Sequence, residues 1–308
     1  MRNKTLYLLT FALLTFAGVR LYYNLTDDFR ISNISDSLPA NKEWEVPLDA
    51  HTKQLLDEVS KEEFNYIGKG AQVYAFASAD GKYVLKFFKF KHLRPSLFIQ
   101  LLPPVGPLKT FKEQNEARKE RKLLGVFQGH AIAYKYDKEH SGLLYIHLNL
   151  TNDIGKSVTL IDKIGRKHNV DLDQTVFVLQ RKGETFRTAI SQDLSQGLVN
   201  DASLKAKKIL EMYKSEYSQG VYDRDHGISH NTGFIGDEPF HLDVGKFSYD
   251  PKMKDPKNHA SDLEHVAYKM KEWVKLNYPQ YAQEFNDTLG SPNTPASQGS
   301  NSALPSSS

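Results

Sequence analysis

The residues with the clearest chemical potential lie in two short stretches on either side of a hairpin that the sequence predicts. Residues 222–231 contain Asp225 and Asn231, and residues 241–245 contain Asp243. Asn and Asp oxygens can hold Mg²⁺ on a triphosphate, while the first Asp can accept a proton from an attacking hydroxyl. Because Asp, Asn, Gly and His also suit turns, a surface loop is the competing interpretation. The stretches predict a phosphoryl-transfer site with Asp225 as the base.

A second group of candidate residues lies near the start of the folded body. Gly68 and Gly70 fall in a turn between two predicted strands, and Lys86 lies in the next strand. Glycines let backbone amides approach phosphate oxygens, and a lysine on a strand can hold the α- and β-phosphates of a nucleotide. An ordinary hairpin with a solvated lysine is the alternative, because short glycine motifs often occur by chance. No helix follows the glycines, which excludes a Rossmann fingerprint and a Walker A loop.

The third candidate is Glu120, in the predicted helix Thr110–Phe127. It precedes three apolar residues by three, four and seven positions, which places it on the apolar face of the helix. A carboxylate on a core-facing surface needs a partner, and Lys86 would supply one. Glu116, one turn earlier, is the alternative partner for Lys86. A solvated pair between Glu120 and a neighbouring basic residue is the other interpretation.

The elements that must position these residues follow a clear order along the chain. Strands are predicted at Phe64–Ile67, Gln72–Ser78, Tyr83–Phe88, Ile132–Tyr136, Leu143–Leu148, Val158–Asp162, Asn169–Leu172 and Val176–Leu179. Helices are predicted at Leu48–Val59, Thr110–Phe127, Thr185–Ser191, Leu204–Gln219 and Asp262–Leu276. A strand-rich part with one helix therefore precedes a helix-rich part, which predicts an α+β fold of two lobes.

In this order, the motifs resemble those of the protein-kinase-like superfamily over about residues 62–250. The matching positions are Gly68, Gly70 and Val73 for the glycine-rich loop, Lys86 for the phosphate-binding lysine, Glu120 for its partner, Asp225 for the catalytic base, and Asn231 and Asp243 for the metal ligands. The stretch around Leu179 looks like the strand that runs into the hinge, whose backbone would bind adenine. Asp223 stands where a His is usual. The resemblance implies a two-lobed kinase-like fold that uses ATP and Mg²⁺.

Several departures from the family pattern affect the expected function. The loop lacks its third glycine, the step from Asp225 to Asn231 is one residue longer than usual, and no Ala-Pro-Glu follows Asp243. Little chain remains for a peptide-docking subdomain, which favours an atypical kinase or a small-molecule or lipid phosphotransferase. We predict a membrane-anchored protein that transfers the ATP γ-phosphate to an unknown protein, small-molecule or lipid acceptor. A catalytically degenerate pseudokinase, acting as a nucleotide-binding or scaffold module, is the alternative.

The composition narrows the kinds of partner. The 308 residues include 40 Lys and Arg against 37 Asp and Glu, a net charge of +3, so we expect no nucleic-acid partner. The chain has no Cys, which excludes disulfides, thiolate metal sites and a Cys nucleophile. A metal would need oxygen or imidazole ligands, which favours Mg²⁺. A Zn or Fe site that uses His226, His230 and His241 is an alternative.

The N-terminal region predicts a membrane anchor. Arg2 and Lys4 precede an uncharged run from Thr5 to Val19, a pattern typical of an export signal. No clear cleavage site follows, so we expect an uncleaved signal anchor over residues 1–25 and a single-pass membrane protein; a buried core helix is the alternative. The two basic residues favour a cytoplasmic N-terminus. The body would then lie on the far side, where ATP is scarce, so the side of the membrane stays open.

The remaining boundaries follow from composition. Residues 26–46 are polar and aperiodic and are predicted to form a linker. Residues 47–182 would form the strand-rich lobe, with a proline-rich insertion at 92–108, and residues 183–288 the helical lobe. Residues 289–308 lack charged side chains and are predicted to be a disordered tail.

Overall fold

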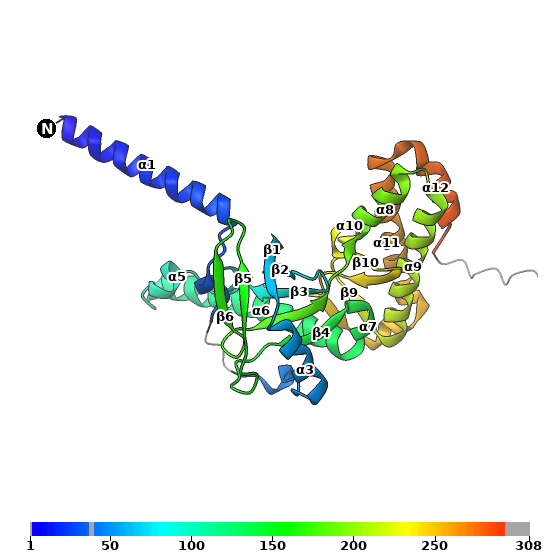
Figure 1. Ribbon diagram of the computed structural model, residues 1–308, viewed down its shortest axis with the longest axis horizontal. Helices are drawn as coiled ribbons and strands as arrows, with labels where there is room; N and C mark the ends of the chain where they lie inside the picture. The colour runs from blue at the N-terminus through cyan, green and yellow to red at the C-terminus, as the bar shows by residue number, and fades with distance from the viewer. Residues whose placement is uncertain (1, 37–39, 293–308) are drawn as a thin grey trace, which may run out of the picture.

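The structure of the chain, a computed structural model, describes residues 2–36 and 40–292. Residues 293–308 of the tail expected to be disordered lie outside the described residues. The chain folds into a strand-rich half and a helical half that meet side by side (Figure 1). This mixed α+β arrangement confirms the fold class at that level.

The strand-rich half contains one sheet with the order β4-β7-β3-β2-β1-β5-β6. Its strands are β1 (Glu63–Lys69), β2 (Val73–Ser78), β3 (Tyr83–Phe88), β4 (Leu143–His147), β5 (Ser157–Ile161), β6 (Lys167–Asp171) and β7 (Phe177–Arg181). All neighbouring strands are antiparallel except β1 and β5, which are parallel. The strand β3, which contains Lys86, lies in the interior of this sheet between β2 and β7.

The two faces of β3 pack against different cores. Successive side chains of a strand point to opposite faces, so Leu85 and Phe87 enter one buried cluster and Phe88 enters the other. The first cluster includes side chains from α3 (Ala50–Val59), and the second includes side chains from α6 (Gly106–Tyr136). Lys86 shares the face of Phe88, so it points toward the α6 side of the sheet.

The helical half is built around α9 (Val199–Gln219). Its neighbours are α8 (Phe186–Ser195), α11 (Pro256–Asn277) and α12 (Ala282–Leu289). The buried residues of α9 recur every three or four positions, as a helix with one core face requires. Two small sheets cover the end nearest the first half: β8 (Glu184–Thr185), β10 (Thr232–Ile235) and β11 (Glu238–His241) form one, and β9 (Val221–Asp223) and β12 (Phe247–Tyr249) form the other.

The predicted strand Ile132–Tyr136 is wrong, because these residues form the last turns of α6. The side chains of Leu123, Phe127, His130 and Ala133 are all buried. Their spacing of three or four residues continues the helical period past Phe127, and packing on that face outweighs the strand propensity of the Ile and Tyr residues. The helix is therefore 31 residues long.

Within the segment predicted to be a linker, residues 26–46, the described residues 26–36 and 40–46 include side chains that belong to the folded body. Phe29 and Ile34 are fully buried in one core cluster, and Trp44 packs in the other against Phe127, with ring centroids 5.0 Å apart. The segment is mostly polar, and its three buried aromatic and aliphatic residues are spaced too irregularly to show a helical or strand period, so the sequence did not indicate that they are buried. The short helices of the chain are α2 (Ile31–Ile34), η1 (Lys42–Trp44), α4 (Phe90–Leu93), α5 (Leu97–Leu101), α7 (Lys138–Ser141), α10 (Ile228–Asn231), η2 (Pro251–Lys254) and η3 (Pro279–Tyr281).

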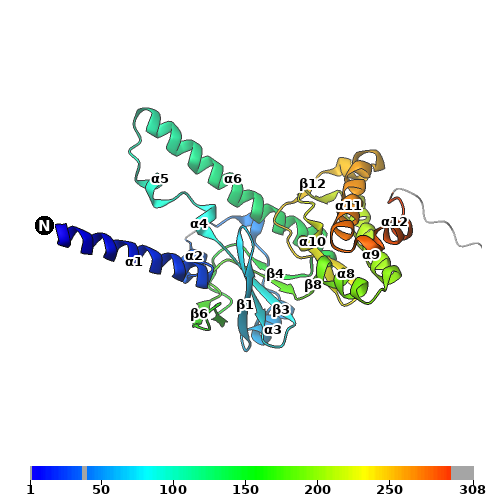
Figure 2. The ribbon, with the colours of Figure 1, turned by 90° about the horizontal axis from the view of Figure 1, so that it is seen from above.

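The first helix, α1 (Arg2–Thr26), covers the predicted anchor and projects from the body without packing on it along most of its length (Figures 1 and 2). Across the residues that the structure describes, no helix has an apolar stretch long enough to cross a membrane.

Candidate functional site

Lys86 lies where the two halves meet. Its Nζ donates a hydrogen bond to the main-chain oxygen of Leu242, which immediately precedes Asp243. Burial lowers the pKa of Lys86, and the nearby carboxylate of Asp243 partly offsets this effect. The lysine from the sheet and the aspartate from the helical half therefore lie close together, as the sequence motifs predict.

Asp243 follows Leu242, the residue whose main-chain oxygen binds Lys86. Its Oδ1 accepts a hydrogen bond from the amide of Gly245 at 2.9 Å. Burial tends to raise the pKa of Asp243, but the charge of Lys86 and the Gly245 amide outweigh it and lower the pKa. The residue is exposed to solvent, although its carboxylate is partly desolvated by the surrounding protein. An ionised, accessible carboxylate of this kind is a suitable ligand for Mg²⁺.

Asn231 is joined to Asp243 through the backbone. The carbonyl oxygen of Asn231 accepts hydrogen bonds from the amides of Leu242 and Asp243, at 2.7 and 3.4 Å. The β10–β11 hairpin lies between these two stretches and pairs Thr232 with His241, which brings its two ends together. Asn231 is buried, and its side-chain amide makes no hydrogen bond within residues 2–36 and 40–292. The donor set of Asn231 and Asp243 fits a hard cation.

Asp225 follows β9 and lies at the surface of the same region. Its Oδ2 is 2.7 Å from Nζ of Lys246, and 40% of the side chain is exposed. Its backbone is held by the buried Asp223, because the Asp225 amide donates a hydrogen bond to Oδ1 of Asp223 at 2.8 Å. Burial raises the pKa of Asp223 to about 7. Asp225 is therefore the accessible carboxylate of the pair, and Asp223 serves as its support.

The predicted pairing of Glu120 with Lys86 is wrong. Glu120 is exposed and has no hydrogen bond or ion pair in the described part of the chain. The N-terminal half of α6, to which Glu120 belongs, projects beyond the sheet (Figure 2), and no residue of α6 before Leu123 is buried. Glu116 lies on the same projecting half, and among the described residues it forms no hydrogen bond or ion pair with Lys86 either.

Gly129 and His130 from the last turns of α6 occupy the place expected for Glu120. An added Cβ atom at Gly129 would lie 2.6 Å from the oxygen of Val244, so the helix backbone packs directly on the Asp-Val-Gly stretch. His130 is buried, and its Nδ1 lies 2.8 Å from the oxygen of Val126. Burial lowers the pKa of His130, and the charges of Asp243 and Lys86 act on it in opposite directions. The only sequence signal was Gly125 and Gly129 four residues apart.

The glycine turn also reaches this site. Gly68 adopts a φ of +155° at a bulge of β1, a conformation that side chains rarely allow. A Cβ atom at Gly245 would lie 3.2 Å from Asp243 Oδ1, 3.5 Å from Gln72 Oε1 and 3.6 Å from His130 Cε1. Gln72, which lies between the turn and β2, therefore converges with His130 on the Asp-Val-Gly stretch.

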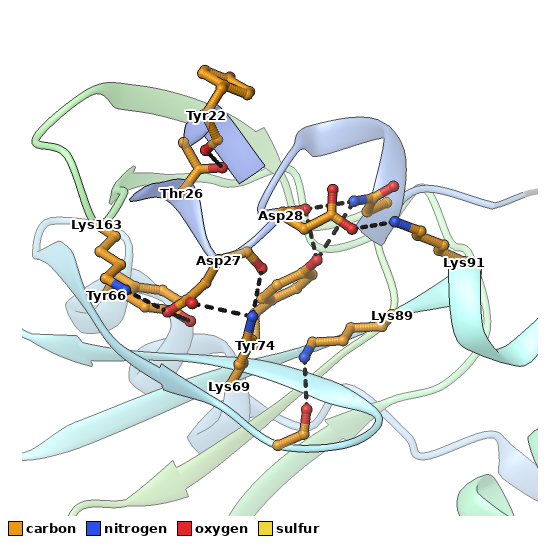
Figure 3. A network of polar contacts seen from close by, with 12 residues as sticks. Tyr22, Thr26, Asp27, Asp28, Tyr66, Lys69, Tyr74, Lys89, Lys91 and Lys163 are labelled. Atoms are coloured by element: carbon orange, nitrogen blue, oxygen red, sulfur yellow. Dashed lines mark hydrogen bonds and ion pairs between the residues drawn. The ribbon is translucent and has the colours of Figure 1, made fainter. Parts of the chain in front are cut away.

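Lys89 holds the turn in place. Its Nζ donates to the oxygen of Gly70 at 2.6 Å, and burial lowers its pKa to about 8 (Figure 3). Gly70 also closes the turn by donating its amide to the oxygen of Val73 at 3.0 Å. Val73 begins β2 on the same face of the sheet as Lys86, because it pairs with Phe88. Of the three residues predicted for the loop, Val73 therefore shares the face of Lys86, while the Gly70 oxygen is held by Lys89.

Leu179 lies in β7, the strand that leads into the helical half. It pairs with Leu85 and is buried in the cluster on the face opposite Lys86, so only its backbone could contact a nucleotide. The neighbouring Gln180, like Lys86, forms a hydrogen bond between the two halves. Its Nε2 donates to the oxygens of Ser141 and His241, at 2.6 and 2.8 Å.

The three histidines considered for a Zn or Fe site do not form one group. His226 pairs with Asp262 at 2.7 Å and His241 with Glu216 at 2.7 Å, while His230 contacts Ser229. A different group, Asp137, His140 and Glu216, has ligand atoms within 4.8 Å of one another. Burial and the charge of Asp137 raise the pKa of Glu216 well above its usual range. Oε1 of Glu216 lies 2.7 Å from Nε2 of His241, while its Oε2 is buried without a hydrogen-bond partner among the described residues.

Comparison with known proteins gives distant structural neighbours only. No protein-family model matches the chain, and no curated protein matches its sequence. The bifunctional kinase-methyltransferase WbdD matches with 12% identity and a TM-score of 0.34, over 71% of this chain and 40% of its own length. Rv3197 of Mycobacterium tuberculosis, solved in complex with erythromycin, matches with 11% identity and a TM-score of 0.34, over 89% of this chain and 81% of its own. This chain thus spans less than half the length of WbdD.

Proposed function

We propose that the chain binds ATP with Mg²⁺ where its two halves meet and transfers the γ-phosphate to an acceptor hydroxyl. The observation that carries this proposal is the convergence of Lys86 with the Asp243 stretch, and of that stretch with Asn231. These side chains come from positions far apart in the sequence. They supply one cation for phosphates and two oxygen ligands for a metal, the set that phosphoryl transfer requires.

The proposed roles follow from position. Lys86 would hold phosphate oxygens, and Asn231 and Asp243 would hold Mg²⁺, which neutralises charge on the phosphates when bound. Asp225 would take the proton of the acceptor hydroxyl. As the new bond forms from that oxygen to the γ-phosphorus, the bond to the bridging oxygen breaks and leaves ADP. Lys246, 2.7 Å from Asp225, would add a second positive charge beside the transferred group.

Binding is tested by thermal denaturation of the full chain with and without ATP and Mg²⁺. A ligand at a hundredfold excess over its Kd stabilises the native state by about 2.7 kcal/mol. We expect a rise in the midpoint for wild type, and no rise for Lys86→Met or Asp243→Ala. Lys82→Met and Asp237→Ala are matched controls, because each substitution removes the same charge at an exposed position outside the proposed site. An equal rise in Asp243→Ala would contradict the proposed metal-nucleotide site.

Transfer is tested separately with Asp225→Asn. We expect this variant to keep the ATP-dependent rise in midpoint and to lose phosphoryl transfer by about 10²–10⁴-fold, the usual contribution of a general base. The transfer is measured as ADP formation in the presence of hydroxyl acceptors. If wild type and Asp225→Asn form ADP at the same rate, the base assignment fails.

The second candidate function is a nucleotide-binding module without transfer activity. It is favoured by the contacts of Lys86, whose ammonium donates to the Leu242 oxygen. Among the described residues of α6, no Glu or Asp forms an ion pair with Lys86. Under this alternative, wild type would show the ATP-dependent rise in midpoint and Asp243→Ala would lose it, yet neither would form ADP.

A further inference from the structure

Two segments of the chain carry most of its exposed large apolar side chains. Of the 24 such side chains in the described residues, ten lie on α1 and six lie between Leu97 and Phe111. We call residues 97–111, which comprise α5 and the start of α6, the tip. Concentrated apolar surface of this kind marks an interaction site, whereas single exposed apolar residues need no explanation. We therefore infer that the two segments contact a binding partner.

The tip exposes its apolar side chains, while hydrogen bonds from its own side chains bind some of its main-chain oxygens. Leu97, Phe98 and Leu101 are 75%, 70% and 82% exposed, and no residue of α5 is buried. Nζ of Lys112 donates to the oxygen of Gln100 at 2.7 Å, and the Gln100 side chain donates to the oxygen of Pro95 at 2.8 Å. These bonds give the tip a defined shape without covering its apolar side chains.

Both segments project in the same direction. In two perpendicular views, α1 and the tip leave the strand-rich half on the side away from the helical half, and α1 reaches farther (Figures 1 and 2). They are two convex projections, and no groove between them is formed by the exposed residues named above. A broad surface that meets both at once suits this shape better than a compact protein ligand.

The direction of α1 is fixed by a polar junction at its C-terminal end (Figure 3). Asp27 and Asp28 adopt left-handed φ angles of 52° and 63°, which end the helix sharply. The Asp27 carboxylate pairs with Lys69 and Lys163, each at 3.1 Å, and Tyr66 donates to it at 3.0 Å. These partners lower the pKa of Asp27 although burial opposes them.

Asp28 completes the junction. Its carboxylate pairs with Lys91, and its main-chain oxygen accepts from the hydroxyl of Tyr74 at 2.8 Å. Lys91 belongs to α4, which directly precedes the tip in sequence. The C-terminal end of α1 is therefore held by β2, through Tyr74, and by α4, through Lys91.

The tip lies within the most basic part of the chain. Residues 89–122 contain nine Lys and Arg residues and three Glu residues. Three of the basic residues are held by other groups, Lys89 by Gly70, Lys91 by Asp28 and Arg94 by Asp36. The other six lie with the three Glu residues on the first half of α6, a net charge of +3 on that segment. Apolar side chains combined with basic ones bind the interface of bilayers that contain anionic lipids. A neutral apolar protein surface would gain nothing from this charge.

We propose that α1 and the tip together bind the surface of a bilayer that contains anionic lipids. The side chains of Leu97, Phe98 and Leu101 enter the interfacial layer, and the basic residues of the first half of α6 face the headgroups. This inference is independent of the proposed nucleotide site, because none of its residues contacts Lys86, Asn231 or Asp243.

The chain has no cysteine, which permits a direct test with single labels. Leu101→Cys and Leu276→Cys would each carry an environment-sensitive fluorophore on the full chain. Leu276, at the end of α11, is 77% exposed and serves as the matched control for Leu101 at 82%. With vesicles of equal parts phosphatidylcholine and phosphatidylglycerol, we expect a blue shift of the emission for the label at 101 and none at 276.

Charge is tested by vesicle co-sedimentation. Lys109→Gln with Arg118→Gln is expected to weaken binding to the anionic vesicles by about 25-fold, at roughly fivefold for each basic residue near the surface. Lys257→Gln with Lys269→Gln, two exposed positions on α11, is the control and should bind as wild type does.

Several results would overturn the proposal. They are absence of vesicle binding, equal emission from the two labels on bound protein, and equal binding to the anionic vesicles and to phosphatidylcholine alone. A shift of the label at 101 that grows with protein concentration without vesicles would show that a second copy of the chain covers the tip, which also excludes the proposed role.

Discussion

The contact between α6 and the Asp-Val-Gly stretch can be tested with two glycines of the same helix. Gly125 and Gly129 both lie inside α6, so replacing either by Ala gains about 0.5–1 kcal/mol of helix propensity. A Cβ atom at Gly125 would meet no atom within 4 Å. At Gly129 it would lie 2.6 Å from the Val244 oxygen and 2.8 Å from the Gly245 carbon, both of the backbone.

The helix contribution is the same for both variants and cancels in their comparison. The difference in free energy of unfolding between Gly125→Ala and Gly129→Ala is therefore the overpacking cost, about 1–3 kcal/mol. Urea denaturation of the two variants measures it directly. We also expect Gly129→Ala alone to weaken ATP binding, because the helix must move away from Asp243. If Gly129→Ala is as stable as Gly125→Ala, the close packing of α6 on this stretch is refuted.

Two further predictions concern buried polar groups. Gln180→Leu removes the donor for the oxygens of Ser141 and His241 and should lower the free energy of unfolding by about 1–3 kcal/mol in urea, whereas Gln174→Leu at an exposed position should not. Because the pKa of Asp223 is raised to about 7 in the folded state, that state keeps a proton which the unfolded chain releases near pH 3.9. Stability from this group should fall by up to about 4 kcal/mol as the pH rises through this range, and Asp223→Asn should remove that part of the slope.

The site residues that could be predicted are those held by short-range order. Asn231 and Asp243 flank the β10–β11 hairpin, and a hairpin brings its ends together whatever the rest of the chain does. Lys86 lies on a strand whose alternation fixes the face it points to. For these three residues the local pattern is enough to predict the position, whereas Asp225 follows β9 and its role as base stays a prediction.

Glu120 could not be placed in the same way. Apolar spacing indicates which face of a helix is buried, but it does not indicate which turns of a long helix contact the body. In α6 only residues from Leu123 onward are buried, and the preceding turns project into solvent. Gly129 and His130 are the α6 residues that lie next to the Asp243 stretch. In the sequence they are only a small residue and a single histidine, which do not indicate this position.

The proposed nucleotide site and the proposed membrane surface are connected through continuous elements and can still be separated experimentally. The helix α6 begins in the tip and packs on Val244 at Gly129, and Lys69, which pairs with Asp27, directly precedes Gly70. Gly129 lies in the C-terminal part of α6, whereas Leu101 belongs to α5, before the start of that helix. Gly129→Ala should therefore weaken the response to ATP and leave the vesicle-induced shift of a label at 101 unchanged, while Lys109→Gln with Arg118→Gln should do the reverse. A variant at either end of α6 that changed both responses would mean that the helix couples the two surfaces.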